Sequence, residues 1–171
     1  MRDALIAELN VDAQRVYACG YSNGGMMAYG LACAMSDRIA AVGSVSGTML
    51  GGAESCAPGA THPMPVINIH GTDDSVLPYD GAPGYTAAAD VMAYWAEVSG
   101  ITADPVMASQ DDDGTVIERY LYEAGDAGST VVHYKVIGGG HVWFTDWSYD
   151  EQDTGELVWG FLSQFDLEGA R

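Results

Sequence analysis

The fold is decided by one stretch of the sequence, RVYACGYSNGGMMAYGLACAM at residues 15–35. Residues 15–19 predict a short strand, and that strand runs directly into the glycine-rich residues 20–25. Apolar side chains then recur at helical spacing up to Met35, which predicts a helix. The local order is therefore strand, sharp turn, helix.

The turn matches the pattern Gly-x-Ser-x-Gly, with Gly20, Ser22 and Gly24 at its fixed positions. The serine of this pattern has a positive φ, so the residues two before and two after it must be small. The turn raises the hydroxyl above the sheet at a helix N-terminus, where backbone N–H groups favour negative charge. The pattern predicts Ser22 as a nucleophile and the Asn23 N–H as an oxyanion donor. A glycine-rich connection also matches so short a pattern, so its partners decide between the two readings.

Strands and helices alternate along the rest of the chain. Strands are predicted at residues 39–45, 66–69, 116–122 and 130–136, the last two as a hairpin, and helices at residues 1–10, 87–99 and after Asp153. This alternation predicts an α/β fold with a mostly parallel sheet flanked by helices. A length of 171 residues with 48% hydrophobic residues suits one core, so we expect a single domain over residues 1–171.

An acid and a histidine follow two of the later strands. Asp73 and Asp74 come after strand 66–69, and His141 follows Gly138–Gly140 beyond the last strand. Sheet enzymes collect their catalytic groups at the carboxyl ends of strands. Serine, acid, histidine is the chain order of an α/β-hydrolase, in which the histidine takes the serine proton during attack on an ester carbonyl.

Three segments, residues 20–28, 70–79 and 138–143, resemble the polyhydroxybutyrate depolymerase and feruloyl esterase group of α/β-hydrolases. The second segment of that group reads His-Gly-Thr-x-Asp-x-x-Val-Pro, which places the acid on Asp74 and leaves Asp73 as the alternative. The resemblance implies a serine carboxylic ester hydrolase that acts on short-chain, hydroxyalkanoate, polyester or feruloyl-type esters. The alternative function is a weak or inactive truncated hydrolase that serves as a binding or assembly partner.

Aromatic side chains surround the predicted triad. We expect Trp143, and after it Tyr21 and Phe144, to contact the substrate. In the resembled group Pro-Gly usually follows the residue at Trp143, whereas Phe144 and Thr145 follow it here. His70 is expected to support the loop that carries Asp74.

The resembled group carries about half of its sheet before the elbow helix, including a loop that supplies a second oxyanion donor. This chain begins near that helix, so strand 15–19 is expected to be a sheet edge with unpaired backbone groups. We therefore expect a homo-oligomer that forms through this surface. The oxyanion hole is expected to be incomplete, or completed by another chain or another local group.

The net charge of −18, from 24 acidic and 6 basic residues, disfavours nucleic acid and anionic membranes as partners. The opening ten residues lack the apolar run of a signal peptide, although the resembled group is often secreted. The sequence does not predict a compartment.

Three cysteines are present, and their spacing suits no zinc site. Cys19 lies in an apolar strand and is expected to be a buried thiol. Cys33 and Cys56 could then pair, which would imply an oxidising compartment at some stage. The acids at 111–113 are expected to form a solvated turn rather than a cation site. We therefore expect no metal and no cofactor.

Overall fold

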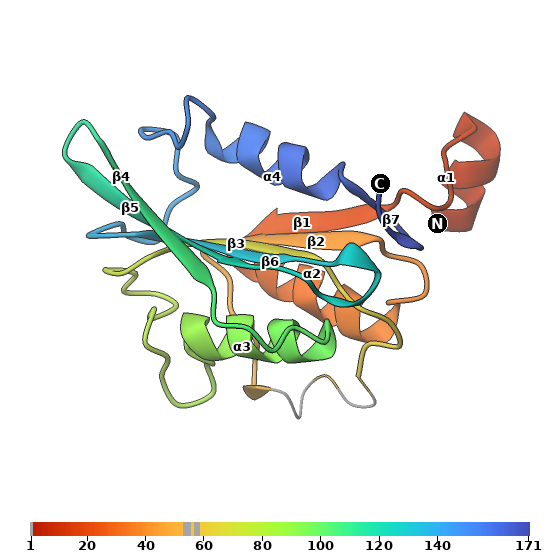
Figure 1. The fold of residues 1–171 in the computed structure, drawn as a ribbon, viewed down its shortest axis with the longest axis horizontal. Coiled ribbons are helices and arrows are strands. Elements are labelled where there is room, and N and C mark those ends of the chain that lie inside the picture. The colour runs from red at the N-terminus through yellow and green to blue at the C-terminus, as the bar shows by residue number, and fades with distance from the viewer. Residues whose placement is uncertain (1, 53–55, 57–58) are drawn as a thin grey trace.

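The computed structural model describes residues 2–52, 56 and 59–171, and a six-stranded sheet forms its centre (Figure 1). The strands lie in the order β1-β2-β3-β6-β5-β4. Their bounds are β1 Tyr17–Tyr21, β2 Ala41–Val45, β3 Val66–Gly71, β4 Val106–Asp112, β5 Thr115–Tyr122 and β6 Val131–Val136. β1, β2, β3 and β6 are parallel, while β5 and β4 continue the sheet as an antiparallel hairpin.

β2 and β3 are built mainly from small and β-branched residues because helices cover both of their faces. Every residue of β2 and β3 is buried. Such strands read as continuous apolar runs, and this is how residues 66–69 appear in the sequence. The pattern thus predicted the two central strands correctly.

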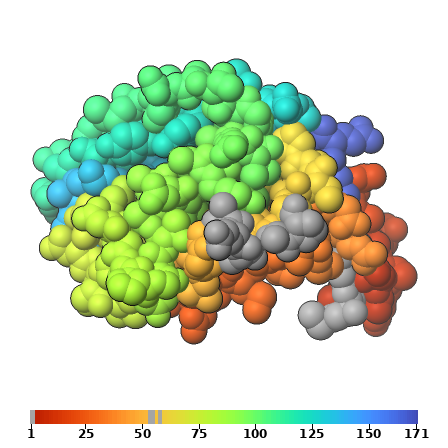
Figure 2. Space-filling model, turned by 90° about the horizontal axis from the view of Figure 1, so that it is seen from below, coloured from red at the N-terminus to blue at the C-terminus, as the bar shows by residue number. Residues whose placement is uncertain are grey.

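Helices form a layer on each side of the sheet (Figure 1). α4 (Thr154–Leu162) lies on one face, and α2 (Asn23–Ala34) and α3 (Ala88–Val98) lie on the other. Two clusters of buried apolar side chains fill the spaces between sheet and helices. Figure 2 shows α3 and the chain before it, in green and yellow-green, spread over the second face. The predicted α/β fold with a mostly parallel sheet is confirmed.

α4 begins with a capping box formed by Asp153 and Glu156. Asp153 Oδ1 accepts from the Glu156 N–H at 2.9 Å, and the Asp153 N–H donates to Glu156 Oε2 at 3.0 Å. Two N–H groups that the helix itself leaves unsatisfied are thereby bound.

β4 is a strand that the sequence analysis missed. Five of its seven residues are exposed and none is buried, and only β5 pairs with it at the edge of the sheet. Without a buried face the strand has no alternation of apolar and polar residues to reveal it. The acids at 111–113 lie at its end, where Asp111 Oδ1 accepts the Gly114 N–H at 2.8 Å in the turn to β5.

The cysteines differ in part from the prediction. Cys33 and Cys56 form a disulfide, which joins α2 to the loop that follows β2. Cys19, expected to be buried, is exposed. The reason is its place on β1, because an edge strand receives cover from only one neighbouring strand.

The outer edge of β1 is open. The Ser22 N–H donates to the Val45 carbonyl at 2.9 Å and the Ala40 N–H to the Val16 carbonyl at 2.8 Å, so the even-numbered residues bind β2. The backbone groups of Tyr17 and Cys19 face away from β2. Within residues 2–52, 56 and 59–171, no strand pairs with that side.

Self-association through this edge remains a prediction. Two copies related by a two-fold axis could pair their β1 strands antiparallel, so sedimentation at micromolar concentration should give about twice the 18.0 kDa mass of one chain. Cys19→Pro removes one outward-facing N–H without touching the β1–β2 ladder, and this variant should sediment as a monomer. A compact monomer for the unchanged chain would contradict the prediction.

α1 (Arg2–Leu9) projects beyond the end of the sheet, and Leu5 and Leu9 on it are exposed (Figure 1). Among the helices of the described ranges, none has the length and apolar character needed to cross a membrane.

Candidate active site

Ser22 occupies the sharp turn between β1 and α2. Its φ is 54° and its ψ is −118°, a conformation that non-glycine residues rarely adopt. A Cβ at Gly20 would lie 2.5 Å from the backbone carbon of Gly24, so strand and helix can approach only if residue 20 is glycine. The strained turn leaves the Ser22 hydroxyl at the carboxyl end of the parallel sheet.

The glycine requirement differs by one residue from the expected pattern. A Cβ at Gly24 would meet nothing within 4 Å, whereas at Gly25 it would lie 2.4 Å from Ser44 Oγ on β2. Gly25 therefore fits α2 against the sheet, and the expected steric need at Gly24 is wrong. The motif alone does not reveal Gly25, because its contact is with a distant strand.

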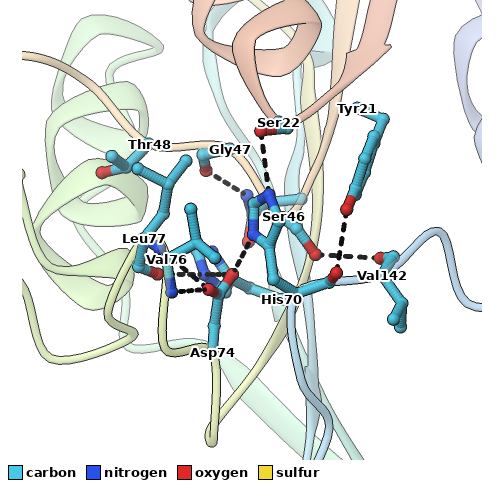
Figure 3. A network of polar contacts seen from close by, with 12 residues as sticks. Tyr21, Ser22, Ser46, Gly47, Thr48, His70, Asp74, Val76, Leu77 and Val142 are labelled. Carbon is cyan, nitrogen blue, oxygen red and sulfur yellow. Dashed lines mark hydrogen bonds and ion pairs between the residues drawn. The ribbon is translucent and has the colours of Figure 1, made fainter.

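The structure brings Ser22, His141 and Asp74 together (Figure 3). His141 Nε2 lies 2.9 Å from Ser22 Oγ, and His141 Nδ1 lies 2.8 Å from Asp74 Oδ2. An ionised carboxylate only accepts hydrogen bonds, so Nδ1 carries the imidazole proton. Nε2 is then the acceptor that faces the serine hydroxyl.

Asp74 is buried, with 4% of its surface exposed, and each of its oxygens accepts hydrogen bonds. Oδ1 accepts the backbone N–H groups of Val76 and Leu77, both at 2.8 Å. Burial alone would raise the pKa of Asp74, but the hydrogen bonds from His141, Leu77 and Val76 outweigh it and hold that pKa below its ordinary value. The carboxylate is thus ionised and fixed in orientation.

His70 is a second imidazole at the same carboxylate. Its Nε2 lies 3.1 Å from Asp74 Oδ2 and 2.9 Å from the Leu77 carbonyl. Because both neighbours are acceptors, Nε2 carries the proton. Burial lowers the pKa of His70, although the Leu77 carbonyl and Asp74 oppose this shift, so the ring is neutral at pH 7. His70 thereby links Asp74 to Leu77 within the loop that carries the acid.

Asp73, the alternative acid, is not the carboxylate that binds His141. It is exposed, and its Oδ1 accepts from the Thr72 hydroxyl at 3.3 Å. Its backbone N–H instead binds the Gly139 carbonyl at 2.9 Å. A Cβ at Gly71 would lie 2.1 Å from that same carbonyl, so the loops that carry the acid and the histidine touch only because residue 71 is glycine.

Asn23 is the first residue of α2, so its N–H has no acceptor within the helix. This N–H is available beside the Ser22 hydroxyl at the positive end of the helix dipole. Three aromatic residues, Trp143, Tyr21 and Phe144, were also expected to contact the substrate, and their exposed fractions differ.

Trp143 is 37% exposed, and it lines a cavity of about 360 Å³ beside the His141 loop. Tyr21 is 38% exposed, and its hydroxyl donates to the His141 carbonyl at 2.8 Å (Figure 3). Phe144 is only 4% exposed and packs on Trp147, with 5.9 Å between ring centroids. Phe144 therefore packs mainly in the core, but it also lines the same cavity as Trp143, and its contact with the substrate stays a prediction.

Sequence reasoning missed one polar group of the site, the Ser46 hydroxyl. It donates to the Val142 carbonyl at 3.0 Å, next to the histidine (Figure 3). The available signal was its position directly after β2, at the same sheet edge as Ser22 and Asp74.

Comparison with known proteins identifies the family of this chain. A family model described as Phospholipase/Carboxylesterase matches residues 3–113. The bifunctional acetylxylan esterase/xylanase XynS20E of Neocallimastix patriciarum is 30% identical over 98% of this chain and 23% of its own length. Feruloyl esterase B of Piromyces equi is 29% identical over 92% of this chain and 28% of its own. The chain thus spans about a quarter of the length of these two relatives.

Solved structures support the fold. An acetyl xylan esterase from Aspergillus awamori superimposes with a TM-score of 0.61 at 16% identity, covering 93% of this chain and 63% of that structure. Esterase PE8 gives a TM-score of 0.56 at 19% identity over 84% of this chain and 50% of its own. The elbow, the parallel sheet and the family match lead to one conclusion: this chain belongs to the phospholipase/carboxylesterase family and has an α/β-hydrolase fold.

Proposed function

We propose that this chain hydrolyses carboxylic esters through an acyl-enzyme on Ser22. The observation that carries the proposal is the continuous hydrogen-bonded series from Ser22 Oγ through His141 to Asp74, with links of 2.9 and 2.8 Å. A serine hydroxyl is a weak nucleophile unless a neighbouring base removes its proton during attack. His141 Nε2 is placed to do so.

In the first half-reaction, Ser22 Oγ forms a bond to the ester carbonyl carbon as its proton passes to His141 Nε2. The carbonyl oxygen becomes an oxyanion, which accepts a hydrogen bond from the Asn23 N–H. His141 then gives the proton to the alcohol oxygen as the carbon–oxygen bond breaks. The buried Asp74 carboxylate stabilises the imidazolium between these two transfers.

In the second half-reaction, water attacks the acyl carbon and its proton passes to His141. The same proton returns to Ser22 Oγ as the acid leaves, so the free enzyme is restored and one ester and one water give one acid and one alcohol. No metal or cofactor takes part in these steps.

The candidate substrates are short-chain, hydroxyalkanoate or polyester, and feruloyl-type esters. The relatives named feruloyl esterase and acetylxylan esterase support this range. Trp143, exposed beside the cavity near His141, offers an apolar ring surface to the acyl or alcohol part of the ester.

The test is hydrolysis of p-nitrophenyl acetate, p-nitrophenyl butyrate and methyl ferulate by the purified chain. We expect saturable hydrolysis of at least one ester. Specific activity that falls on dilution would show that a second copy completes the site, for instance its oxyanion hole. The absence of hydrolysis for all three esters, at any protein concentration, would favour the alternative of an inactive binding or assembly partner.

A further inference from the structure

The loop that carries His141 begins with three consecutive glycines, Gly138–Gly140. Gly138 has a φ of 73°, and a Cβ at Gly138 or Gly140 would meet nothing within 4 Å. Gly139 between them packs against Phe144 and Val136, and a Cβ there would lie 2.8 Å from the Phe144 ring. At the two outer glycines no such packing is present, so hydrogen bonds to the backbone contribute to the position of the loop.

The first part of the loop is tied to the loop that carries Asp74. The Gly138 N–H donates to Thr72 Oγ1 at 2.8 Å, and the Gly139 carbonyl accepts the Asp73 N–H at 2.9 Å. These bonds fix the histidine relative to the acid. They do not fix the distance between the histidine and Ser22.

The second part of the loop is tied to the ends of β1 and β2. The Tyr21 hydroxyl donates to the His141 carbonyl at 2.8 Å, and the Ser46 hydroxyl donates to the Val142 carbonyl at 3.0 Å (Figure 3). Two consecutive carbonyls thus receive hydroxyl donors from two neighbouring parallel strands. The Tyr21 ring also lies against the His141 ring, with centroids 5.1 Å apart.

Rare backbone conformations occur at Ser46 itself and at Ser22, the residue that follows Tyr21. Ser46 has a φ of 48° and is fully buried, and its own N–H donates to the Ile69 carbonyl at 2.8 Å. Tyr21 directly precedes Ser22, so the turn that orients the nucleophile also orients the tyrosine. Residues held in rare backbone conformations gather at functional sites, and this geometry aims both hydroxyls at the histidine loop.

We propose that Tyr21 and Ser46 form a hydroxyl clamp that holds His141 at hydrogen-bonding distance from Ser22. This proposal rests on the function proposed above. Both are positioning residues, because each binds the backbone of the base and neither is assigned contact with the reacting atoms. Misplacing a base by about 1 Å can cost a factor on the order of 100 in rate.

The test compares Tyr21→Phe and Ser46→Ala with the unchanged chain. Tyr21→Phe keeps the ring against His141 and deletes only the hydroxyl, and Tyr94→Phe removes a tyrosine hydroxyl from α3 as a matched control. We expect kcat to fall about tenfold in each single variant and about 100-fold in the double variant. KM and the thermal midpoint should stay near those of the unchanged chain, and Tyr94→Phe should have unchanged kcat.

Two readouts separate a clamp from a merely structural role. Labelling of Ser22 by a serine-directed phosphonate should slow in parallel with kcat, because both require His141 to take the serine proton. A loss of activity that follows a lowered thermal midpoint, with the remaining folded protein as active as the unchanged chain, would overturn the clamp. Unchanged kcat in both single variants would overturn it as well. Failure of the unchanged chain to hydrolyse or to be labelled would instead reject the proposed function.

Discussion

Replacing Ser22 with alanine is expected to lower the rate of ester hydrolysis by a factor of about 10⁴ or more. The substitution removes the oxygen that would attack the carbonyl, and no other hydroxyl is placed 2.9 Å from His141 Nε2 among the described residues. Alanine carries a Cβ as serine does, so it meets the same backbone strain at a φ of 54°. The thermal midpoint should therefore remain close to that of the unchanged chain.

The matched control is Ser75→Ala, which removes an exposed serine hydroxyl from the loop that follows Asp74. This variant should hydrolyse p-nitrophenyl butyrate at the unchanged rate. Equal rates for Ser22→Ala and the unchanged chain, with both proteins folded, would rule out the acyl-enzyme route.

Replacing Asp74 with asparagine should reduce kcat by a factor on the order of 10⁴. The backbone N–H groups of Val76 and Leu77 require an acceptor, so the amide oxygen must take the place of Oδ1. The amide NH₂ then faces His141 Nδ1 and favours the tautomer with its proton on Nε2. In that tautomer His141 cannot accept the Ser22 proton.

Asp73→Asn is the matched control, because it makes the same chemical change at the neighbouring exposed residue. Its kcat should be unchanged. The reverse result, with Asp73→Asn inactive and Asp74→Asn active, would mean that the acid of the site has been assigned to the wrong residue.

The lowered pKa of Asp74 also predicts a dependence of stability on pH. The ionised form is favoured in the folded state, so its contribution is complete above the unfolded value of about 3.9 and is lost as pH falls through the lower folded value. The difference in unfolding free energy between the unchanged chain and Asp74→Asn, measured in urea, should therefore shrink as the pH is lowered from about 5 to about 2.

Much of the site follows from local sequence. The turn at Ser22 depends on neighbours within a few residues, and the order of serine, acid and histidine places all three at one sheet edge. The choice of Asp74 over Asp73 needed the resemblance to a known family. The structure adds its physical basis, since only Asp74 receives the Val76 and Leu77 N–H groups.

The features that the sequence did not reveal depend on contacts between distant segments. Gly25 matters because of Ser44 on β2, and Ser46 matters because of the Val142 carbonyl. Phe144 follows Trp143 directly, yet one is buried and the other exposed, a difference that proximity to His141 cannot predict. The exposure of Cys19 is different, because it follows from the edge position of β1, which the sequence analysis did expect.

The most direct test is reaction of the unchanged chain with a fluorophosphonate, followed by mass spectrometry of its peptides. We predict one covalent adduct, on Ser22, whose formation is greatly slowed in Asp74→Asn. A folded chain that forms no adduct, or one labelled on another residue while Ser22 stays free, would contradict the assignment of Ser22 as the activated nucleophile.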